Sequence, residues 1–178
     1  MLTRQLESIV QTKACCGCGS CAQRCPQSCI SMNADNEGFL YPTIHKDACI
    51  DCGLCDKVCP VLTPSTQHEP LSIYAAINKN EEIRLQSSSG GIFSLLAEQT
   101  INEGGVVFGA QFNEHWQVKL GYTEVLEGIA PFRGSKYVQA RTEKSFRLAE
   151  IFLQQGKKVL FTGTPCQIDG IKKFLRKE

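Results

Sequence analysis

The pattern of apolar and polar residues predicts alternating strands and helices from residue 71 onward. Apolar runs typical of strands occupy 71–77, 106–112, 118–124 and 157–161. Helical spacing marks the segment that follows Gly90 and ends at Gly104–Gly105, the segment 142–156, and the start of a further helix at 167. The residues expected to share a helix face are Ile92, Leu95 and Leu96 in the first helix, and Phe146, Ala149, Phe152 and Leu153 in the second. Strands that alternate with helices in this way predict an α/β sheet.

The N-terminal part of the chain follows a different pattern and is dominated by cysteine. Its clearest element is a hairpin, in which the apolar ends 29–32 and 39–41 flank the polar turn 33–38. A polar stretch with prolines, 63–70, then separates the two parts. We therefore predict one domain at 1–62, a linker at 63–70 and a second module at 71–178.

Composition and charge argue against several classes of function. Lys plus Arg is 19 and Asp plus Glu is 18, a net charge of +1, so no nucleic acid or anionic membrane is an expected partner. The apolar runs are too short to span a membrane, and the N-terminus lacks the apolar core of a signal peptide. We therefore expect a soluble, cytoplasmic protein without a membrane span.

Cysteines carry the candidate chemistry. Ten of the 11 cysteines lie between Cys15 and Cys59, and this clustering, with the odd number, argues against a disulfide framework. Two runs, "CCGCGSCAQRCP" and "CIDCGLCDKVCP", repeat the spacing C-x2-C-x2-C-x3-C-P. The repeated cysteines are Cys15, Cys18, Cys21 and Cys25 in the first run, and Cys49, Cys52, Cys55 and Cys59 in the second. This spacing is typical of bacterial two-cluster ferredoxins and predicts two 4Fe-4S clusters as metal cofactors.

In such repeats the fourth cysteine of each run ligates the other cluster. We therefore expect Cys59 to join the first three cysteines of the first run, and Cys25 to join those of the second. Structural zinc is the alternative, but zinc sites usually pair two C-x2-C units across a longer spacer. The residues Phe39, Leu40 and Tyr41 are expected to cover a cluster face.

Two further cysteines lie close to the repeat. Cys16 is an alternative ligand during cluster assembly, and Cys29 is expected to be a buried apolar residue. Residues 1–62 carry five basic and six acidic side chains, a net charge of −1. Two oxidised clusters bring this domain to about −5, so we expect a redox partner protein or subunit with a basic face.

Two loops in the second module are candidate binding sites. The segment "QSSSGG" at 86–91 precedes a helix, where hydroxyls and backbone amides suit a phosphate, and an ordinary helix cap is the alternative. The segment "LFTGTPCQ" at 160–167 reads as strand, loop and helix, the place where open α/β sheets bind ligands. Cys166 lies near the predicted helix N-terminus, which lowers a thiol pKa, although a lone cysteine is as often an inert core residue.

The order of these segments resembles the coenzyme F-420 hydrogenase/dehydrogenase beta-subunit family. The resemblance rests on the cysteine repeat followed by "SSSGGIFSLLAE", "GGVVFGAQF", "SKYVQA" and "LFTGTPCQIDGIKKFL". It implies that the second module binds FAD, which exchanges electrons with the clusters and with coenzyme F-420 or a similar organic acceptor or donor. The positions that match the recurring stretches are Ser88, Ser89, Gly90, Gly91, Lys136, Tyr137, Gln139, Thr162, Gly163, Thr164, Pro165 and Cys166.

Length separates this chain from the family pattern. Members continue past the helix that follows "TPCQ", so the resemblance implies an incomplete flavin module. The predicted fold class is α+β or α/β, a two-cluster ferredoxin-like domain followed by an incomplete mixed α/β domain. The expected function is that of an oxidoreductase subunit that passes single electrons between the clusters and FAD, which pairs them. The alternative is a ferredoxin-type electron carrier or docking module without bound flavin.

Overall fold

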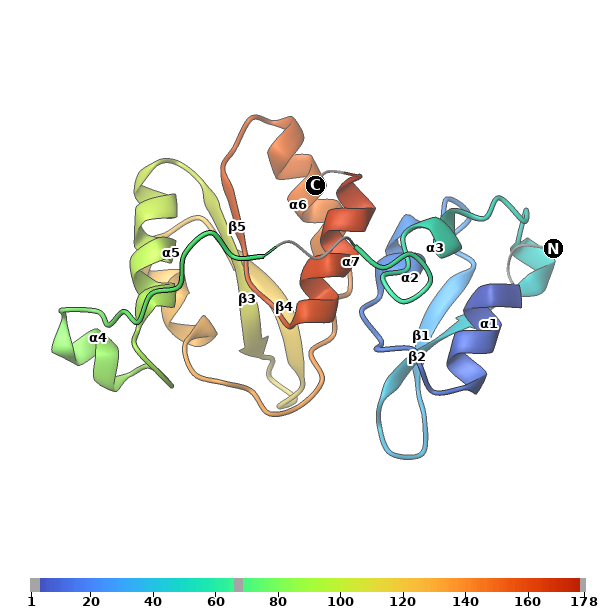
Figure 1. The fold of residues 1–178 in the computed structure, drawn as a ribbon, viewed down its shortest axis with the longest axis horizontal. Helices are drawn as coiled ribbons and strands as arrows, with labels where there is room; N and C mark the ends of the chain where they lie inside the picture. The colour runs from blue at the N-terminus through green and yellow to red at the C-terminus, as the bar shows by residue number, and fades with distance from the viewer. Residues whose placement is uncertain (1–3, 66–68, 177–178) are drawn as a thin grey trace. The chain divides into compact units, whose positions relative to one another are not determined.

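The chain folds into two compact units (Figure 1). A computed structural model describes residues 4–65 and 69–176, so residues 66–68 of the predicted linker lie outside the described residues. Unit 1 comprises residues 1–66, 141–147 and 163–178, and unit 2 comprises residues 67–140 and 148–162. Both units combine helices with a small sheet, so the architecture is of the α+β kind.

Unit 1 is built from short helices around one hairpin. Its elements are α1 (Arg4–Gln11), α2 (Ser20–Arg24), β1 (Ile30–Ala34), β2 (Leu40–Ile44), the 3-10 helix η1 (Lys46–Ala48), α3 (Leu54–Lys57) and α7 (Pro165–Leu175). The predicted hairpin is confirmed, because β1 pairs antiparallel with β2 from Ile30 opposite Ile44 to Ala34 opposite Leu40. Cysteine side chains supply much of the core, which contains Leu6, Ile9, Cys21, Cys25, Cys29, Ile30, Cys55 and Cys59.

Unit 1 differs from the predicted division of the chain, because two later segments return to it. Residues 141–147 and 163–178, which the sequence division placed in the second module, belong to this unit. The Ser20 hydroxyl donates to the Gly170 carbonyl of α7 at 3.0 Å, and the Thr142 hydroxyl donates to the Cys18 carbonyl at 3.1 Å. These contacts tie α2 to segments far along the chain, which short-range patterns do not encode.

Arg147 makes the most extensive of these returning contacts. Its Nε donates to the Gln23 carbonyl at 2.5 Å, and a terminal guanidinium nitrogen donates to the Cys25 carbonyl at 3.1 Å. The Gln23 side-chain oxygen in turn accepts from the Phe146 amide at 2.9 Å. A five-residue helix leaves its last carbonyls without intrahelical partners, so Arg147 supplies the donors that the end of α2 lacks.

Unit 2 is a mixed sheet covered by helices. Its elements are α4 (Glu81–Leu85), α5 (Ile92–Asn102), β3 (Val106–Phe112), β4 (Val118–Thr123), the 3-10 helix η2 (Leu126–Phe132) and β5 (Val159–Phe161). The helix α6 (Ser145–Gln154) begins in unit 1 and continues into unit 2. The sheet order is β4-β3-β5, in which β3 pairs antiparallel with β4 and parallel with β5. The strands predicted at 106–112, 118–124 and 157–161 are therefore confirmed within two residues.

The strand β3 forms the centre of unit 2, with alternate residues on its two faces. Val107 packs with Ala97, Ile129 and Phe132, so α5 and η2 cover one face. On the other face the Phe108 ring lies 6.2 Å from the Phe152 ring of α6. Val106, Val107 and Phe108 are fully buried, which makes β3 the best-protected strand of this unit.

The prediction of which face of the helix after Gly90 is buried is wrong. Leu95 and Leu96 remain 50% and 47% exposed, whereas Ser94, Ala97 and Thr100 are the buried residues of α5. The small residues face β3 because they allow the helix to approach the sheet closely. For the helix at 142–156 the prediction holds, since Phe146 and Ala149 are fully buried.

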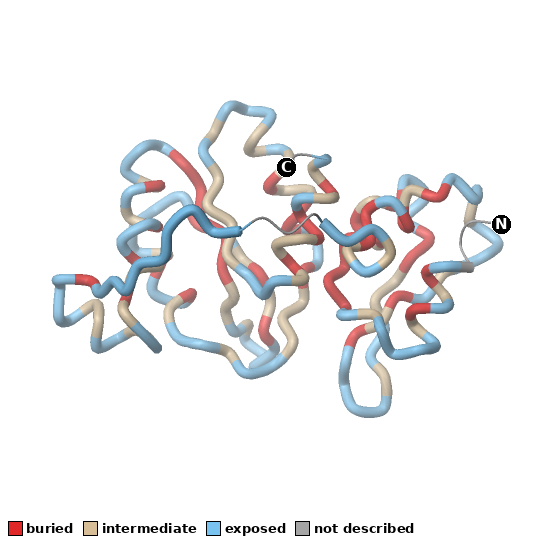
Figure 2. The backbone as a smooth tube through the Cα atoms, in the orientation of Figure 1, coloured by how far each residue is buried: buried red, intermediate tan, exposed pale blue. Residues whose placement is uncertain are grey.

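The strand predicted at 71–77 is not present. These residues form no strand, and Leu71, Ile73 and Tyr74 are 103%, 87% and 85% exposed (Figure 2). Strand propensity becomes a strand only where another edge accepts its hydrogen bonds, and in the described residues β3 pairs only with β4 and β5. In the described part of the chain, no helix is both long and apolar enough to cross a membrane.

Candidate functional site

The two cysteine runs fold into the same local structure. Gly19 and Gly53 take left-handed backbone conformations, with φ of 75° and 68°, and each precedes a short helix. The third cysteine of each run lies inside that helix, Cys21 in α2 and Cys55 in α3. At Gly19 any Cβ would lie 2.2 Å from the Thr142 hydroxyl oxygen, so glycine is required there by both conformation and space.

Each run borders its own pocket, together with one cysteine from the other run. The first pocket, of about 290 Å³, is lined by Cys15, Cys16, Cys18, Cys21 and Cys59. The second pocket, of about 340 Å³, is lined by Cys25, Cys29, Cys49, Cys52 and Cys55. The remaining walls are mainly apolar and glycine residues, including Leu6, Met32 and Pro42 in the first, and Ile30, Ile44 and Ile50 in the second.

The thiols are arranged around a space and do not converge on a point. Among the described residues, no three Cys, His, Asp or Glu side chains lie close enough to hold one metal ion. A single zinc ion needs four sulfurs at about 2.3 Å from the metal, whereas the corners of a cubane hold their thiolates farther apart. Five cysteines line each pocket, and thiolates are the ligands that hold iron–sulfur clusters.

Burial opposes thiolate formation at several of these positions until a cation is bound. Burial raises the pKa of Cys15 and Cys21, and it raises the pKa of Cys55 to about 11, with a further contribution from the neighbouring Asp56. Backbone amides work in the opposite direction, and the Gly17 amide donates to the Cys15 sulfur at 3.4 Å. Iron that binds here must displace protons from these buried thiols.

Cys25 is the exception, because its pKa is lowered. Its burial raises the pKa, but hydrogen bonds from the Cys29 side chain and from the amides of Cys29, Gln27 and Ser28 outweigh that effect. The Cys25 and Cys29 sulfurs are 3.3 Å apart, and the pKa of Cys29 is raised to about 12 by burial and by Cys25. The opposite directions of the two pKa shifts favour Cys29 as the donor and Cys25 as the acceptor of the hydrogen bond between the sulfurs.

The comparison with known families agrees with this geometry. Residues 14–62 match the 4Fe-4S dicluster domain. This segment is an iron–sulfur domain with a role in electron transfer, and it covers both cysteine runs. No curated protein matches the chain.

Two details of the cysteine region differ from the sequence expectations. Phe39 is 49% exposed and borders neither pocket, and the hairpin residues that line the first pocket are Met32 and Pro42. Cys29 is buried as expected, but it also lines the second pocket and contacts Cys25. Its position four residues after Cys25, at the start of the hairpin, was the available signal for this contact.

The predicted loop at 86–91 lies beside the segment 133–137 in unit 2. The Ser135 amide donates to the Ser88 hydroxyl at 2.6 Å, and Arg133 donates to Gln86 at 2.8 Å and to Ser94 at 2.9 Å. Ser89 is exposed. Neither serine caps α5, because the residue at its N-cap is Gly91 and no side chain caps it. The helix-cap alternative for these serines is therefore wrong.

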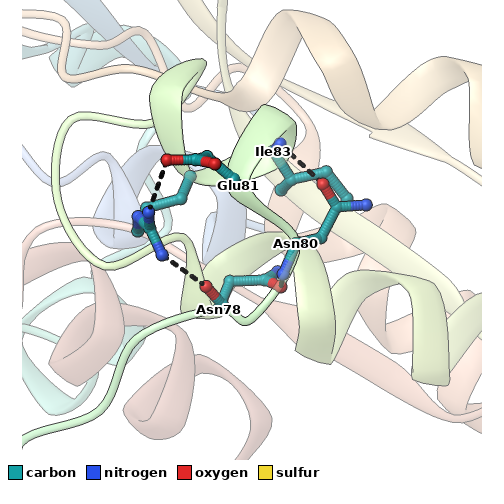
Figure 3. A network of polar contacts seen from close by, with 5 residues as sticks. Asn78, Asn80, Glu81 and Ile83 are labelled. Atoms are coloured by element: carbon teal, nitrogen blue, oxygen red, sulfur yellow. Dashed lines mark hydrogen bonds and ion pairs between the residues drawn. The ribbon is translucent and has the colours of Figure 1, made fainter.

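Asn78 fixes the glycine end of this loop. Its amide donates to the Gly90 carbonyl at 2.6 Å, and its side chain donates to the Gly91 carbonyl at 3.2 Å. Asn78 is held in turn by Arg84 of α4, which donates to its carbonyl at 3.4 Å (Figure 3). A Cβ at Gly90 would lie 2.5 Å from the Ala76 carbonyl oxygen, so this glycine is needed for packing whatever the loop binds.

The other positions that the family resemblance singles out fall into two groups. Lys136 belongs to unit 2, where its ammonium donates to the carbonyls of Pro131 and Arg133, and burial lowers its pKa. Tyr137 is 93% exposed and Gln139 is half-buried. Thr162 donates to the Phe108 carbonyl at the sheet edge of unit 2, whereas Gly163, Thr164, Pro165 and Cys166 belong to unit 1.

Cys166 does not have the lowered pKa that its place at the helix start predicts. Its pKa is raised, because it is hydrogen-bonded to Cys16 and partly buried. Thr164 and Gln167 form a capping box at the start of α7, with the Thr164 amide donating to the Gln167 side chain at 3.0 Å. The Cys166 sulfur lies 3.2 Å from the Thr164 hydroxyl oxygen.

Proposed function

We propose that the chain is an electron-transfer subunit that holds two cross-ligated 4Fe-4S clusters. The ligands are Cys15, Cys18, Cys21 and Cys59 for the first cluster, and Cys49, Cys52, Cys55 and Cys25 for the second. The observation that carries the proposal is that each pocket is bordered by three cysteines of one run and the last cysteine of the other. When bound, such clusters supply reversible one-electron transfer.

The residues of the chain bind and shield the clusters. Apolar walls such as Leu6 and Met32 exclude water from the first pocket, and Ile30 and Ile44 do so in the second. The Cys29 sulfur lies 3.3 Å from the Cys25 sulfur, so its thiol donates a hydrogen bond to Cys25 when Cys25 serves as a thiolate ligand. Arg147 and Gly170 position α2, which carries ligands to both pockets.

Double substitutions test the cross-ligation directly. The reconstituted protein should bind about eight irons, and each ligand replaced by alanine should remove about four. The variant Cys25→Ala/Cys52→Ala should keep about four irons, because both residues serve one cluster, whereas Cys25→Ala/Cys18→Ala should lose nearly all. The reverse pattern would show that each run holds its own cluster. Iron and acid-labile sulfide analysis, with electron paramagnetic resonance after dithionite reduction, distinguishes these outcomes.

The electrons pass onward to an FAD bound by unit 2, and from FAD to an organic acceptor such as coenzyme F-420. The support is the start of α5, where the first-turn amides have no side-chain cap and Ser88, Ser135 and Arg133 lie together. Backbone amides, hydroxyls and a guanidinium are groups that bind a flavin pyrophosphate. The sequence resemblance to the coenzyme F-420 hydrogenase/dehydrogenase beta-subunit family supports the same choice.

Flavin binding is tested by incubating the cluster-loaded chain with FAD and FMN and extracting the bound flavin. Stoichiometric FAD is expected, with weaker binding in Ser88→Ala and unchanged binding in Ser72→Ala, an exposed serine of the same unit. Gly90→Val is a poor test, because the contact with Ala76 would disturb the loop itself. Full iron without flavin would support the alternative, an electron carrier that docks to a separate flavoprotein.

A further inference from the structure

The loops of the two cysteine runs differ in their exposure to solvent. In the second run Asp51 and Cys52 are exposed, whereas Gly17 and Cys18, which occupy the same places in the first run, are buried. The Thr142 hydroxyl donates to the Cys18 carbonyl at 3.1 Å and α7 packs against the Cys18 sulfur, so returning segments of unit 1 cover the first loop. Among the eight proposed ligands, all of which lie in the described part of the chain, Cys52 is the only exposed one.

The two loops also differ in charge. Residues 46–57 of the second run carry three aspartates and two lysines, a net charge of −1, whereas the matching residues 12–23 carry one lysine and no acidic side chain, a net charge of +1. An oxidised cluster with four thiolates adds about −2 to each, which gives about −3 at the second loop and about −1 at the first. A basic protein is therefore attracted more strongly to the second loop than to the first.

Apolar side chains adjoin the exposed ligand position. Pro26 and Ile50 line the second pocket and are exposed, Ile50 to 60%, and Leu54 lines it half-buried. Asp51 follows Ile50 with a left-handed backbone φ of 54°, which matches the φ of 67° at Gly17 in the first run. Glycine takes this conformation with less strain, so the backbone alone does not require an aspartate there. An apolar centre beside a charged rim is the usual composition of a protein–protein interface.

We propose that the surface formed by Pro26, Ile50, Asp51 and Cys52 docks a one-electron redox protein with a basic face, and that electrons enter or leave the chain through the cluster in the second pocket. This inference rests on the proposed function. In the outward direction the reduced cluster gives up one electron and the acceptor of the partner gains it. In the inward direction a reduced partner gives one electron to the oxidised cluster. No bond is made or broken, and no proton is needed.

The docking surface is tested by cross-linking, without electron transfer. Cytochrome c, a small basic haem protein, is the probe. The cluster-loaded full chain and cytochrome c, both oxidised, are treated with a carbodiimide that joins carboxylates to lysines, and the products are digested with trypsin. Cross-links should fall mainly in peptide 47–57, which contains Asp51, and not in peptide 25–46, which contains Glu37 on the exposed hairpin turn.

A matched pair of variants separates local charge from total charge. Asp51→Asn keeps the shape of the side chain and should weaken cytochrome c binding, measured by calorimetry at low salt, by about 2- to 5-fold. Glu37→Gln removes the same charge from an exposed position of unit 1 that borders neither pocket, and it should bind like the wild type. The difference between the two variants should disappear at high salt, because salt screens exposed charges.

The electron route is tested by rapid mixing of the reduced chain with oxidised cytochrome c. The haem has a higher potential than a low-potential cluster, so electrons move to the haem. The variant Cys15→Ala/Cys18→Ala keeps only the second cluster under the proposed ligation and should reduce the haem at the wild-type rate per cluster. The variant Cys25→Ala/Cys49→Ala keeps only the first cluster and should react several-fold more slowly, because electron transfer slows with distance.

Three other outcomes would contradict the proposal. About eight irons with cross-links spread evenly over other acidic peptides would overturn the docking surface and leave the proposed function intact. Equal or faster haem reduction by the variant that keeps only the first cluster would overturn the route through the second. A chain that binds no iron would overturn the proposed function and the electron route together, even with cytochrome c cross-linked to peptide 47–57.

Discussion

Replacing Arg147 with methionine should increase the rate at which the protein loses both clusters. The guanidinium donates to the Gln23 carbonyl at 2.5 Å and to the Cys25 carbonyl at 3.1 Å, at the end of the helix that carries Cys21. Methionine keeps the apolar stem of the side chain but removes both donors. The variant therefore isolates the hydrogen bonds from the packing.

The magnitude follows from the kind of bond and its exposure. A hydrogen bond from a charged group contributes about 1.5–3 kcal/mol, and half-burial of Arg147 reduces this, so the two bonds together contribute about 2–3 kcal/mol. If clusters are lost through local opening of α2, the opening equilibrium and hence the rate of loss should rise about 30- to 150-fold. Both clusters should be affected, because α2 leads from Cys18 and Cys21 at one pocket to Cys25 at the other.

The assay is the anaerobic decay of visible absorbance after addition of an iron chelator. The matched control is Lys144→Met, which removes the same charge from an exposed neighbouring position and should decay like the wild type. Arg147→Lys should lie between the two, because it keeps the charge without the fork of donors. A decay rate for Arg147→Met within about twofold of the control would refute the role assigned to these two bonds.

Three further predictions concern the same unit. In Gly170→Ala the new methyl group would lie 3.2 Å from the Cys18 sulfur, so iron analysis should show weaker iron retention in the first pocket. Alanine favours a helix by about 1 kcal/mol, so the competing effect is a more stable α7. Full iron with a higher melting temperature would contradict the prediction. In Cys29→Ala the Cys25 sulfur loses its thiol donor at 3.3 Å, so a titration followed by electron paramagnetic resonance should find the potential of that cluster lower by on the order of 40 mV, with the other cluster unchanged. Removal of iron should abolish hydrogen-exchange protection in 14–62 but preserve it in β3. The reason is that cysteines form much of the core of unit 1, whereas unit 2 has its own apolar core. Equal loss of protection in both units would disprove their independence.

Local sequence determined the parts of the protein that depend on short stretches of chain. The spacing of the cysteines, with Gly19 and Gly53 inside the loops, was enough to predict the cluster domain, because each loop takes its conformation from a few residues. The hairpin at 29–42 and the strands β3 and β4 were readable for the same reason.

Segments whose partners lie far away in the chain were read less well. The strand predicted at 71–77 has suitable residues but pairs with no edge in the described structure, and α5 turns Ala97 toward β3 and leaves Leu95 and Leu96 exposed. A pattern of apolar residues identifies a face, but the element that comes to lie against it selects which face is buried.

Only the tertiary structure decided what surrounds the cysteines. The sequence alone placed Cys166 and Arg147 in a separate module, whereas the fold returns 141–147 and 163–178 to unit 1. That return puts Arg147 at the end of α2 and Gly170 against Cys18. The spacing of ligands is a property of consecutive residues, but these neighbours are brought together by packing across the whole chain, which no local pattern records.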